Sequence, residues 1–534
     1  MKKYIFKFLF ASFLLLSIAG SVCFVRSEQT VYDWDFTREW NSYMYAGHLL
    51  KQDGFLRMVN VVIESIQSNT YNMIPVVPLL PAFILFGPER SVYIAAIVVV
   101  YGLGALVSFF SFFSIFLSKE EKNKPYVLLF LTLALFIPQS WLPILRGYPD
   151  IGGLIFIFLI WKFHFQSLPE QPYIPQRIFL LVCAAIFRRG YVIWVMSYLI
   201  VWLAQSIIEA IFVLKKQRLH GVYHSLLVAA CTGCMYYILL YPLSAWSTQV
   251  NLSTLYAGYR ATASNLLASW DIFRNFGGYV IVLASIGFYL GIKEGKSKIL
   301  AILLVQTIIT FILHRSVMDF NPHHLYLFIP LIASLMVIFW VVTVRLFCKN
   351  QKNLLMYLFL GIVVWIGNWL YVLSPAPQVT QYVYSNMKIF PLVRKDLGEL
   401  KDLLDTLSIY FDEDPGDVYV LASSFTLNSS ILQNYCSQLY DSQKVDRFCS
   451  RIRTTVDVDA ESDMQIDLDS MKYIVIGNPI QYHMQPNYQQ AIGIPATNML
   501  RGEGVGKAYQ KMTKEWILTG YDHNKVFVYL YKRK

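Results

Sequence analysis

The sequence predicts an α-helical polytopic membrane protein, with about 11 transmembrane helices and a C-terminal α/β domain outside the membrane. Of the 534 residues, 56% are hydrophobic and only 15% are charged, and the mean hydropathy is +0.46. The apolar residues form separate blocks, many of them long enough to cross about 30 Å of hydrocarbon as a helix. This composition excludes a soluble cytosolic enzyme. The net charge of +11 follows the loops between the blocks, which indicates membrane topology rather than nucleic-acid binding.

Charged clusters separate the apolar blocks into eleven candidate spans. These are 4–25, 91–117, 125–142, 151–165, 176–188, 190–214, 222–242, 276–292, 299–313, 325–347 and 354–373. The first span has the basic start and small residues of a secretory signal. We interpret it as an uncleaved anchor, because the residues before Cys23 do not make a convincing lipoprotein box and cleavage would leave both termini outside.

The positions of lysine fix the predicted orientation in the cell membrane. A cytoplasmic N-terminus places every lysine-rich cluster inside, as the positive-inside rule expects. The clusters are Lys2/Lys3/Lys7, Lys119/Lys122/Lys124, Lys215/Lys216/Arg218, Lys293/Lys296/Lys298 and Arg345/Lys349/Lys352. The outer loops carry mostly arginine, whose planar fork suits carboxylates and phosphates. The alternative is that topology excludes lysine from these loops while arginine only snorkels.

The composition changes after Tyr371, so we divide the chain into a membrane domain, 1–374, with an outer loop at 26–90, and an extracytoplasmic domain, 375–534. In the second domain, residues 417–421, 472–477 and 525–531 have the composition of strands, and 391–410 and 425–440 have helical periodicity. Cys436 and Cys449 lie in this domain, where a disulfide is one of two open alternatives. The pair Cys231/Cys234 lies within a span, so a metal site there is not expected.

Two carboxylates stand just after the first span, in the run Tyr32–Trp40. Asp33 and Asp35 are energetically costly at a membrane interface unless they have a role there. A carboxylate that is removed from bulk water and close to another acid has its pKa raised toward the range of a general base. The alternative is that one of them caps a helix that begins near Thr37. One carboxylate can cap the helix while the other reacts.

More acids, arginines and histidines recur in the later outer loops, whereas the inner loops carry almost only lysine. The candidates for substrate binding are Asp150, Arg146, Arg188, Arg189, Arg315, His323 and His324. Each one alone has a structural interpretation as a helix cap or a headgroup contact. Together they indicate attack on a lipid-linked phosphate, in which arginine stabilises the phosphate and a carboxylate takes the proton of the attacking hydroxyl. The sequence contains no P-loop, GxSxG, HExxH or dinucleotide motif.

These residues resemble the GT-C glycosyltransferases, in the protein-mannosyltransferase and aminoarabinose-transferase-like branch. The likeness covers most of the chain in layout. It rests on the DxD-like Asp33-Trp34-Asp35, a tyrosine-rich helix that ends in Ala46–Gly54, a proline-rich re-entry, Asp150 in the sequence RGYPD and a late outer loop with two adjacent histidines. The C-terminal α/β domain is similar to the domains of bacterial members.

The resemblance implies an inverting transfer of a hexose or pentose from a polyprenyl-phosphate donor to a cell-envelope glycan or another acceptor. It implies that an Asp of the first loop is the general base, and Asp35 is favoured over Asp33. DWD departs from the DE or ED pair that is frequent in the family, so the base is not fixed. No cofactor is expected, although DWD with Asp150 could hold a divalent metal, because some members depend on metals. The charge of arginine and histidine can do the same electrostatic work.

Two other functions remain as alternatives. A lipid-linked sugar transporter or flippase should have ionisable residues near the midplane and internal repeats, and neither is clear in the sequence. A glycan ligase or polymerase that uses lipid-diphosphate donors would need more positive charge, and the number of arginines does not decide this. In each case the expected partners are a lipid-linked sugar, an acceptor and the bilayer, and not a nucleic acid.

Overall fold

The structure is a computed structural model, and the chain divides into two compact units. The structure describes residues 2–68, 71–166, 173–212, 219–241, 257–259, 264–348, 351–374, 382–456, 458–459, 468–521 and 524–534. Unit 1 comprises the described residues in the ranges Met1–Arg26, Glu39–Gln249 and Ala261–Phe390. Unit 2 comprises those in the ranges Ser27–Arg38, Val250–Arg260 and Pro391–Lys534. Some sequence predictions fall outside the described residues. They concern Lys215, Lys216, Arg218, Lys349 and residues 375–381.

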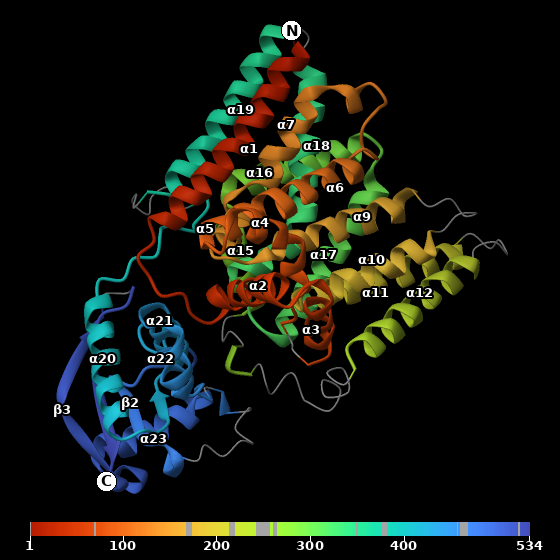
Figure 1. The fold of residues 1–534 in the computed structure, drawn as a ribbon. Coiled ribbons are helices and arrows are strands. Elements are labelled where there is room, and N and C mark those ends of the chain that lie inside the picture. The colour runs from red at the N-terminus through yellow and green to blue at the C-terminus, as the bar shows by residue number, and fades with distance from the viewer. Residues whose placement is uncertain are drawn as a thin grey trace. The chain divides into compact units, whose positions relative to one another are not determined.

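Unit 1 is helical, and Figure 1 shows its helices from red to green. They are α1 (Lys2–Arg26), most of α2 (Asp35–Gln52), α3 (Phe55–Ser68), η1 (Ile74–Leu79), α4 (Leu80–Phe86), α5 (Arg90–Ala96), η2 (Ile97–Gly102), α6 (Leu103–Phe113), η3 (Glu121–Asn123), α7 (Pro125–Leu135), α8 (Pro138–Leu145), η4 (Pro149–Gly152), α9 (Gly153–Gln166), α10 (Ile174–Phe187), α11 (Gly190–Phe212), α12 (Leu219–Leu239), α15 (Asn265–Phe276), α16 (Gly278–Lys293), α17 (Ser297–Val317), η7 (Pro322–Leu327), α18 (Ile329–Phe347) and α19 (Gln351–Val372). Each predicted span coincides with one of these helices or with consecutive helices.

Among the described residues, six helices are long and apolar enough to cross a membrane, and two bent pairs raise the number to eight. The pair α7 and α8 bends by 60°, and the pair α15 and α16 bends by 98°. Gly277 makes the second bend with a positive φ of 85°, and a Cβ there would lie 2.7 Å from the backbone nitrogen of Ser385. The chain is therefore a multi-pass membrane protein. The count of eleven spans and the orientation of the termini stay predictions.

Close helix packing holds unit 1 together. Gly287 of α16 lies so close to α18 that a Cβ would overlap the carbonyl oxygen of Leu335, which is why the small residue is needed there. Between α11 and α17, the hydroxyls of Ser197 and Thr310 form a buried hydrogen bond of 2.6 Å. Helices α1 and α19 lie side by side (Figure 1) through the rings of Phe13 and Trp365.

Unit 2 contains a four-stranded sheet in the order β1-β2-β4-β3. The strands are β1 (Val418–Leu421), β2 (Tyr473–Asn478), β3 (Tyr509–Leu518) and β4 (Val526–Arg533), and the main helices are α20 (Leu397–Glu413), α21 (Ser429–Leu439), α22 (Ser442–Arg447) and α23 (Gln490–Arg501). β1 and β2 are parallel, and the other two pairs are antiparallel. The predicted strands correspond to β1, β2 and β4, and the predicted helices to α20 and α21. The α/β character of this part of the chain is confirmed.

The sheet of unit 2 is covered on both faces. Alternate residues of β1 show this, because Val418 and Val420 pack with α20 and α21 while Tyr419 and Leu421 pack with α23. The segment Ser27–Arg38 also belongs to this unit. Val31 is fully buried in the core beside α20 and α21, and the backbone of Gln29 pairs with Leu392 and Arg394 at 2.9 and 2.8 Å. The segment that carries the DWD motif is thus part of unit 2.

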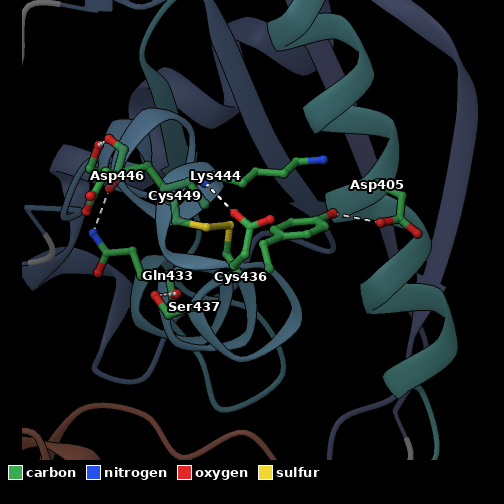
Figure 2. The surroundings of a disulfide bond; sticks show 11 residues. Asp405, Gln433, Cys436, Ser437, Lys444, Asp446 and Cys449 are labelled. Carbon is green, nitrogen blue, oxygen red and sulfur yellow. Dashed lines mark hydrogen bonds between the residues drawn. A yellow bond between two sulfur atoms is a disulfide. The ribbon is translucent and has the colours of Figure 1, made fainter.

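Cys436 and Cys449 form a disulfide, so the alternative left open by the sequence is resolved (Figure 2). The bond joins the last turn of α21 to the short helix η9 (Cys449–Arg451), and the two Cα atoms are 5.7 Å apart. Both cysteines are buried. Near them the Tyr440 hydroxyl donates a hydrogen bond of 2.6 Å to Asp405 of α20.

Replacing both Cys436 and Cys449 by Ser should destabilise unit 2 by about 3 kcal/mol, because the bond closes a loop with a sequence separation of 13. The measurement is thermal unfolding of the full-length protein followed by near-UV circular dichroism. Cys231→Ser, which removes a free thiol of α12, serves as the matched control. Equal melting temperatures for the disulfide variant and wild type would contradict the prediction.

Candidate functional site

Several predicted site residues meet in unit 1 at the places where helices end. Arg188 lies in the extended break between α10 and α11. Asp150 is in η4, immediately before α9, and His323 and His324 are in η7, immediately before α18. These segments are irregular because Pro149 and Pro322 begin the short helices. Side chains distant in sequence are therefore presented together from the ends of three helical segments.

Arg188 is the centre of this site, because its guanidinium pairs with two carboxylates. It donates a short hydrogen bond from Nη1 to Oε1 of Glu39, and its Nε lies 3.1 Å from Oδ2 of Asp150. All three residues are buried, since 8% of the surface of Arg188, 2% of that of Glu39 and 6% of that of Asp150 is exposed. Charges removed from water to this degree require such pairing. We refer to Glu39, Arg188 and Asp150 as the ion triad.

Hydrogen bonds from two tyrosine hydroxyls to backbone carbonyl oxygens hold the segment of Asp150 in place. The Tyr191 hydroxyl donates a hydrogen bond of 2.6 Å to the carbonyl oxygen of Asp150. The Tyr93 hydroxyl donates one of 2.8 Å to the carbonyl oxygen of Gly147. Gly153 allows this approach, because a Cβ there would overlap the ring of Tyr191. The loop before α9 is thus fixed by two buried tyrosines, which positions Asp150 for Arg188.

A group of aromatic rings and imidazoles lies next to the triad. The Arg188 guanidinium lies over the rings of Tyr71 and Tyr148, at 5.3 and 5.8 Å from their centroids. The ring of His323 stacks on that of Tyr148, with 4.7 Å between the ring centroids, and its centroid lies 4.1 Å from that of the His324 ring. Burial, with Arg188 nearby, lowers the pKa of both histidines well below the usual value. Both imidazoles are therefore neutral at pH 7 and act as hydrogen-bonding groups rather than as charges.

The other predicted arginines differ in their surroundings. Arg189 donates a hydrogen bond of 2.5 Å to the hydroxyl of Tyr71, which places it beside the triad. Arg315 pairs with Asp319 at 2.6 Å, at the end of α17. Arg146 donates a hydrogen bond of 2.7 Å to the carbonyl oxygen of Phe390. Tyr71 thus links Arg189 to the triad, while Arg146 and Arg315 contact other partners.

Asp33 and Asp35 belong to unit 2. Asp35 is the first residue of α2, so the helix begins two residues earlier than expected. Asp33 is buried, with 1% of its surface exposed, and its Oδ2 accepts a hydrogen bond of 2.8 Å from Asn428. Its Oδ1 has no hydrogen-bond partner among the described residues. Burial raises the pKa of Asp33 to about 6, although Asn428 and the nearby Arg394 oppose the shift.

Glu39 was not among the residues singled out from the sequence. It is four residues after Asp35 on α2, within the same run Tyr32–Trp40. An acid in the interior of a helix has the ordinary interpretation of a surface residue. The signal that could have identified it is the pair of aromatic residues, Phe36 and Trp40, on either side of Thr37–Glu39. No group of three or more metal-ligating side chains occurs among the described residues.

No protein-family model matches the sequence, and no curated protein matches it. One solved structure to which the chain is similar is the crystal structure of ArnT from Cupriavidus metallidurans bound to undecaprenyl phosphate. The match covers 99% of this chain and 98% of that chain, with a TM-score of 0.43 and 11% sequence identity. A likeness of this degree establishes neither a shared fold nor a shared activity, so the functional argument rests on the site itself.

Arg188→Met should destabilise unit 1 by about 3–5 kcal/mol, because the buried Glu39 and Asp150 would lose the counter-charge of Arg188. The measurement is the thermal unfolding of the detergent-purified protein. Adding Glu39→Gln and Asp150→Asn to the same chain should restore part of the loss. The matched control is Arg26→Met, which breaks an ion pair with Glu89 between two exposed side chains and should cost about 1 kcal/mol or less. Equal losses in Arg188→Met and Arg26→Met would refute the buried triad.

Asp33→Asn should change how stability depends on pH. The pKa of Asp33 is about 6 in the folded chain against an ordinary 3.8, so burial of the acid is tolerated below pH 4 and becomes unfavourable as the pH rises to 6. The melting temperature of the variant relative to wild type should therefore rise between pH 4 and 6 and level off above that. Asn434→Ala, which removes an uncharged contact to the Tyr32 carbonyl, should shift the melting temperature equally at each pH. If the difference in melting temperature between Asp33→Asn and wild type did not change with pH, this would contradict the raised pKa of the buried Asp33.

Proposed function

We propose that the protein is a membrane glycosyltransferase that moves a sugar from a polyprenyl-phosphate donor to a glycan or other envelope acceptor. The observation that carries this proposal is the ion triad, in which two buried carboxylates pair with an arginine at the ends of membrane helices, next to two neutral histidines. Buried charge at the end of a span is uncommon without a functional role. The predicted orientation places these helix ends at the outer face of the membrane.

The pairing within the triad assigns contact with the donor phosphate to residues other than Arg188. Arg188 faces two carboxylates, so its positive charge is already matched before any phosphate arrives. The phosphate of the donor is then left to Arg189, His323 and His324, with Arg146 and Arg315 as the further predicted contacts. Neutral imidazoles can donate hydrogen bonds to phosphate oxygens without a like-charge penalty against Arg188. Such donors stabilise the polyprenyl phosphate as it leaves.

The base that activates the acceptor is one of the acids of the first outer loop. Asp35 and Asp33 are the candidates from the sequence, and the triad adds Glu39. In the proposed inverting step, the carboxylate takes the proton of the acceptor hydroxyl, the hydroxyl oxygen bonds to the anomeric carbon, and the bond to the phosphate oxygen breaks. If Asp33 is the base, kcat/KM falls below a pH of about 6, since that is where its pKa lies.

The test uses the purified protein in detergent with a panel of labelled polyprenyl-monophosphate sugars, and it measures release of polyprenyl phosphate with and without envelope glycan. We expect turnover of at least one donor, and a loss of about 10²–10⁴-fold in the variant that lacks the base. The variants are Asp33→Asn, Asp35→Asn and Glu39→Gln. Glu64→Gln changes an exposed acid of α3 and is the matched control.

Other results of this assay would contradict the transferase proposal. If no donor turns over and all three acid variants complement a deletion strain, the transferase proposal fails and lipid-linked sugar transport becomes the better explanation. Turnover of a lipid-diphosphate donor with no turnover of any monophosphate donor would instead indicate a ligase or polymerase. Repeating the assay after treatment with a chelator tests whether a divalent metal takes part.

A further inference from the structure

Unit 2 carries a cluster of aromatic side chains around the tryptophan of the DWD motif. The Trp34 ring lies 4.8 Å from the ring of His483 and 5.2 Å from that of Phe425, and Phe36 stacks on Phe425 at 6.3 Å. Phe425 is 47% exposed, and Trp34 and Phe36 are partly exposed. We refer to Trp34, Phe36, Phe425 and His483 as the aromatic patch. Aromatic rings that are grouped and left partly exposed can form a binding surface.

The backbone at Trp34 supports a functional reason for the patch. Trp34 has a φ of 43°, in the left-handed region that a bulky residue rarely adopts. Hydrogen bonds of the flanking residues hold this conformation. The Trp34 amide donates to the Ser430 hydroxyl at 3.1 Å, and Asn428 donates to Asp33 at 2.8 Å. The fold therefore accepts local strain in order to direct the indole toward Phe425 and His483.

The described side chains that contact the His483 ring through hydrogen bonds are uncharged. The His483 ring contacts the hydroxyl of Ser423 at 2.6 Å and the amide of Gln489 at 3.1 Å through Nδ1, and the hydroxyl of Tyr259 at 3.4 Å through Nε2. A surface that inserts into a membrane combines apolar rings with lysine and arginine. Rings that are set among hydroxyl, amide and imidazole groups suit a ligand with apolar faces and many hydroxyls, which is the chemistry of a neutral sugar.

We propose that the aromatic patch binds an uncharged sugar ring of the acceptor glycan. Its place in the chain supports this ligand, because Trp34 stands directly between Asp33 and Asp35. A sugar stacked there would present its hydroxyls near Asp33 and Asp35, which are the two candidates from the sequence for the base. Recognition of a sugar rests on the patch alone, whereas its assignment as the acceptor rests on the proposed function.

The experiment measures binding without turnover. Full-length protein in lipid nanodiscs is immobilised and exposed to soluble, uncharged oligosaccharides of hexoses and N-acetylhexosamines, with no donor present. Wild type should bind at least one of them above empty nanodiscs. Phe425→Ala should weaken that binding by about tenfold, which corresponds to about 1.4 kcal/mol, and Phe425→Trp should restore it. Phe527→Ala removes a phenylalanine of β4 that is 39% exposed and lies outside the patch, so its binding should equal that of wild type.

Three results would overturn the proposal. The first is that wild type binds none of the oligosaccharides. The second is that Phe425→Ala binds them as well as wild type does. The third is that Phe425→Ala loses binding to protein-free lipid vesicles but keeps its binding to sugar. Failure of the transferase assay would leave a positive binding result intact, so the two proposals fail separately. If transfer is found, Phe425→Ala should raise the KM for the acceptor and leave the KM for the donor unchanged. An unchanged acceptor KM would refute the assignment as an acceptor site.

Discussion

One buried guanidinium organises the membrane part of this protein. Arg188 is held between Glu39 and Asp150, and all three are shielded from water. An isolated charge in such a place would be strongly unfavourable, so each member depends on the others. The triad also ties three separate segments of chain together, namely α2, the α10–α11 break and the loop before α9. The packing of these three helix ends thus depends on one interaction.

The interruptions of the helices give the site its shape. Long apolar helices satisfy their own backbone groups and leave no place for reactive side chains. Here Pro149, Pro322 and the extended Arg188 interrupt that regularity at the ends of spans, where buried tyrosines bind the freed carbonyl groups. Of the histidines of η7, His324 is buried and His323 is half-buried, and both are neutral at pH 7. The result is a buried polar site at the ends of apolar helices.

Much of this arrangement follows from local patterns. The spans and the strands β1, β2 and β4 are apolar runs, and each was predicted. β3 was missed because charged residues such as Lys511 and Glu515 face the solvent, so it has no apolar run. The partnership of Glu39 with Arg188 joins residues 149 positions apart, and no local pattern reports such a pair. The docking of Ser27–Arg38 within unit 2 was likewise hidden, because it depends on backbone pairing with residues near 392.

The central claim is that the acids of the ion triad serve the transfer reaction as well as the fold. The most direct test is turnover of a polyprenyl-monophosphate sugar by the variant Glu39→Gln and by the variant Asp150→Asn, each compared with wild type at equal amounts of folded protein. Both amides keep a hydrogen-bond acceptor for Arg188, so the structure should be retained while negative charge is lost. The account predicts that at least one variant loses about 10²-fold or more in kcat. Turnover near the wild-type rate in both would contradict it and would leave the triad as a purely structural element.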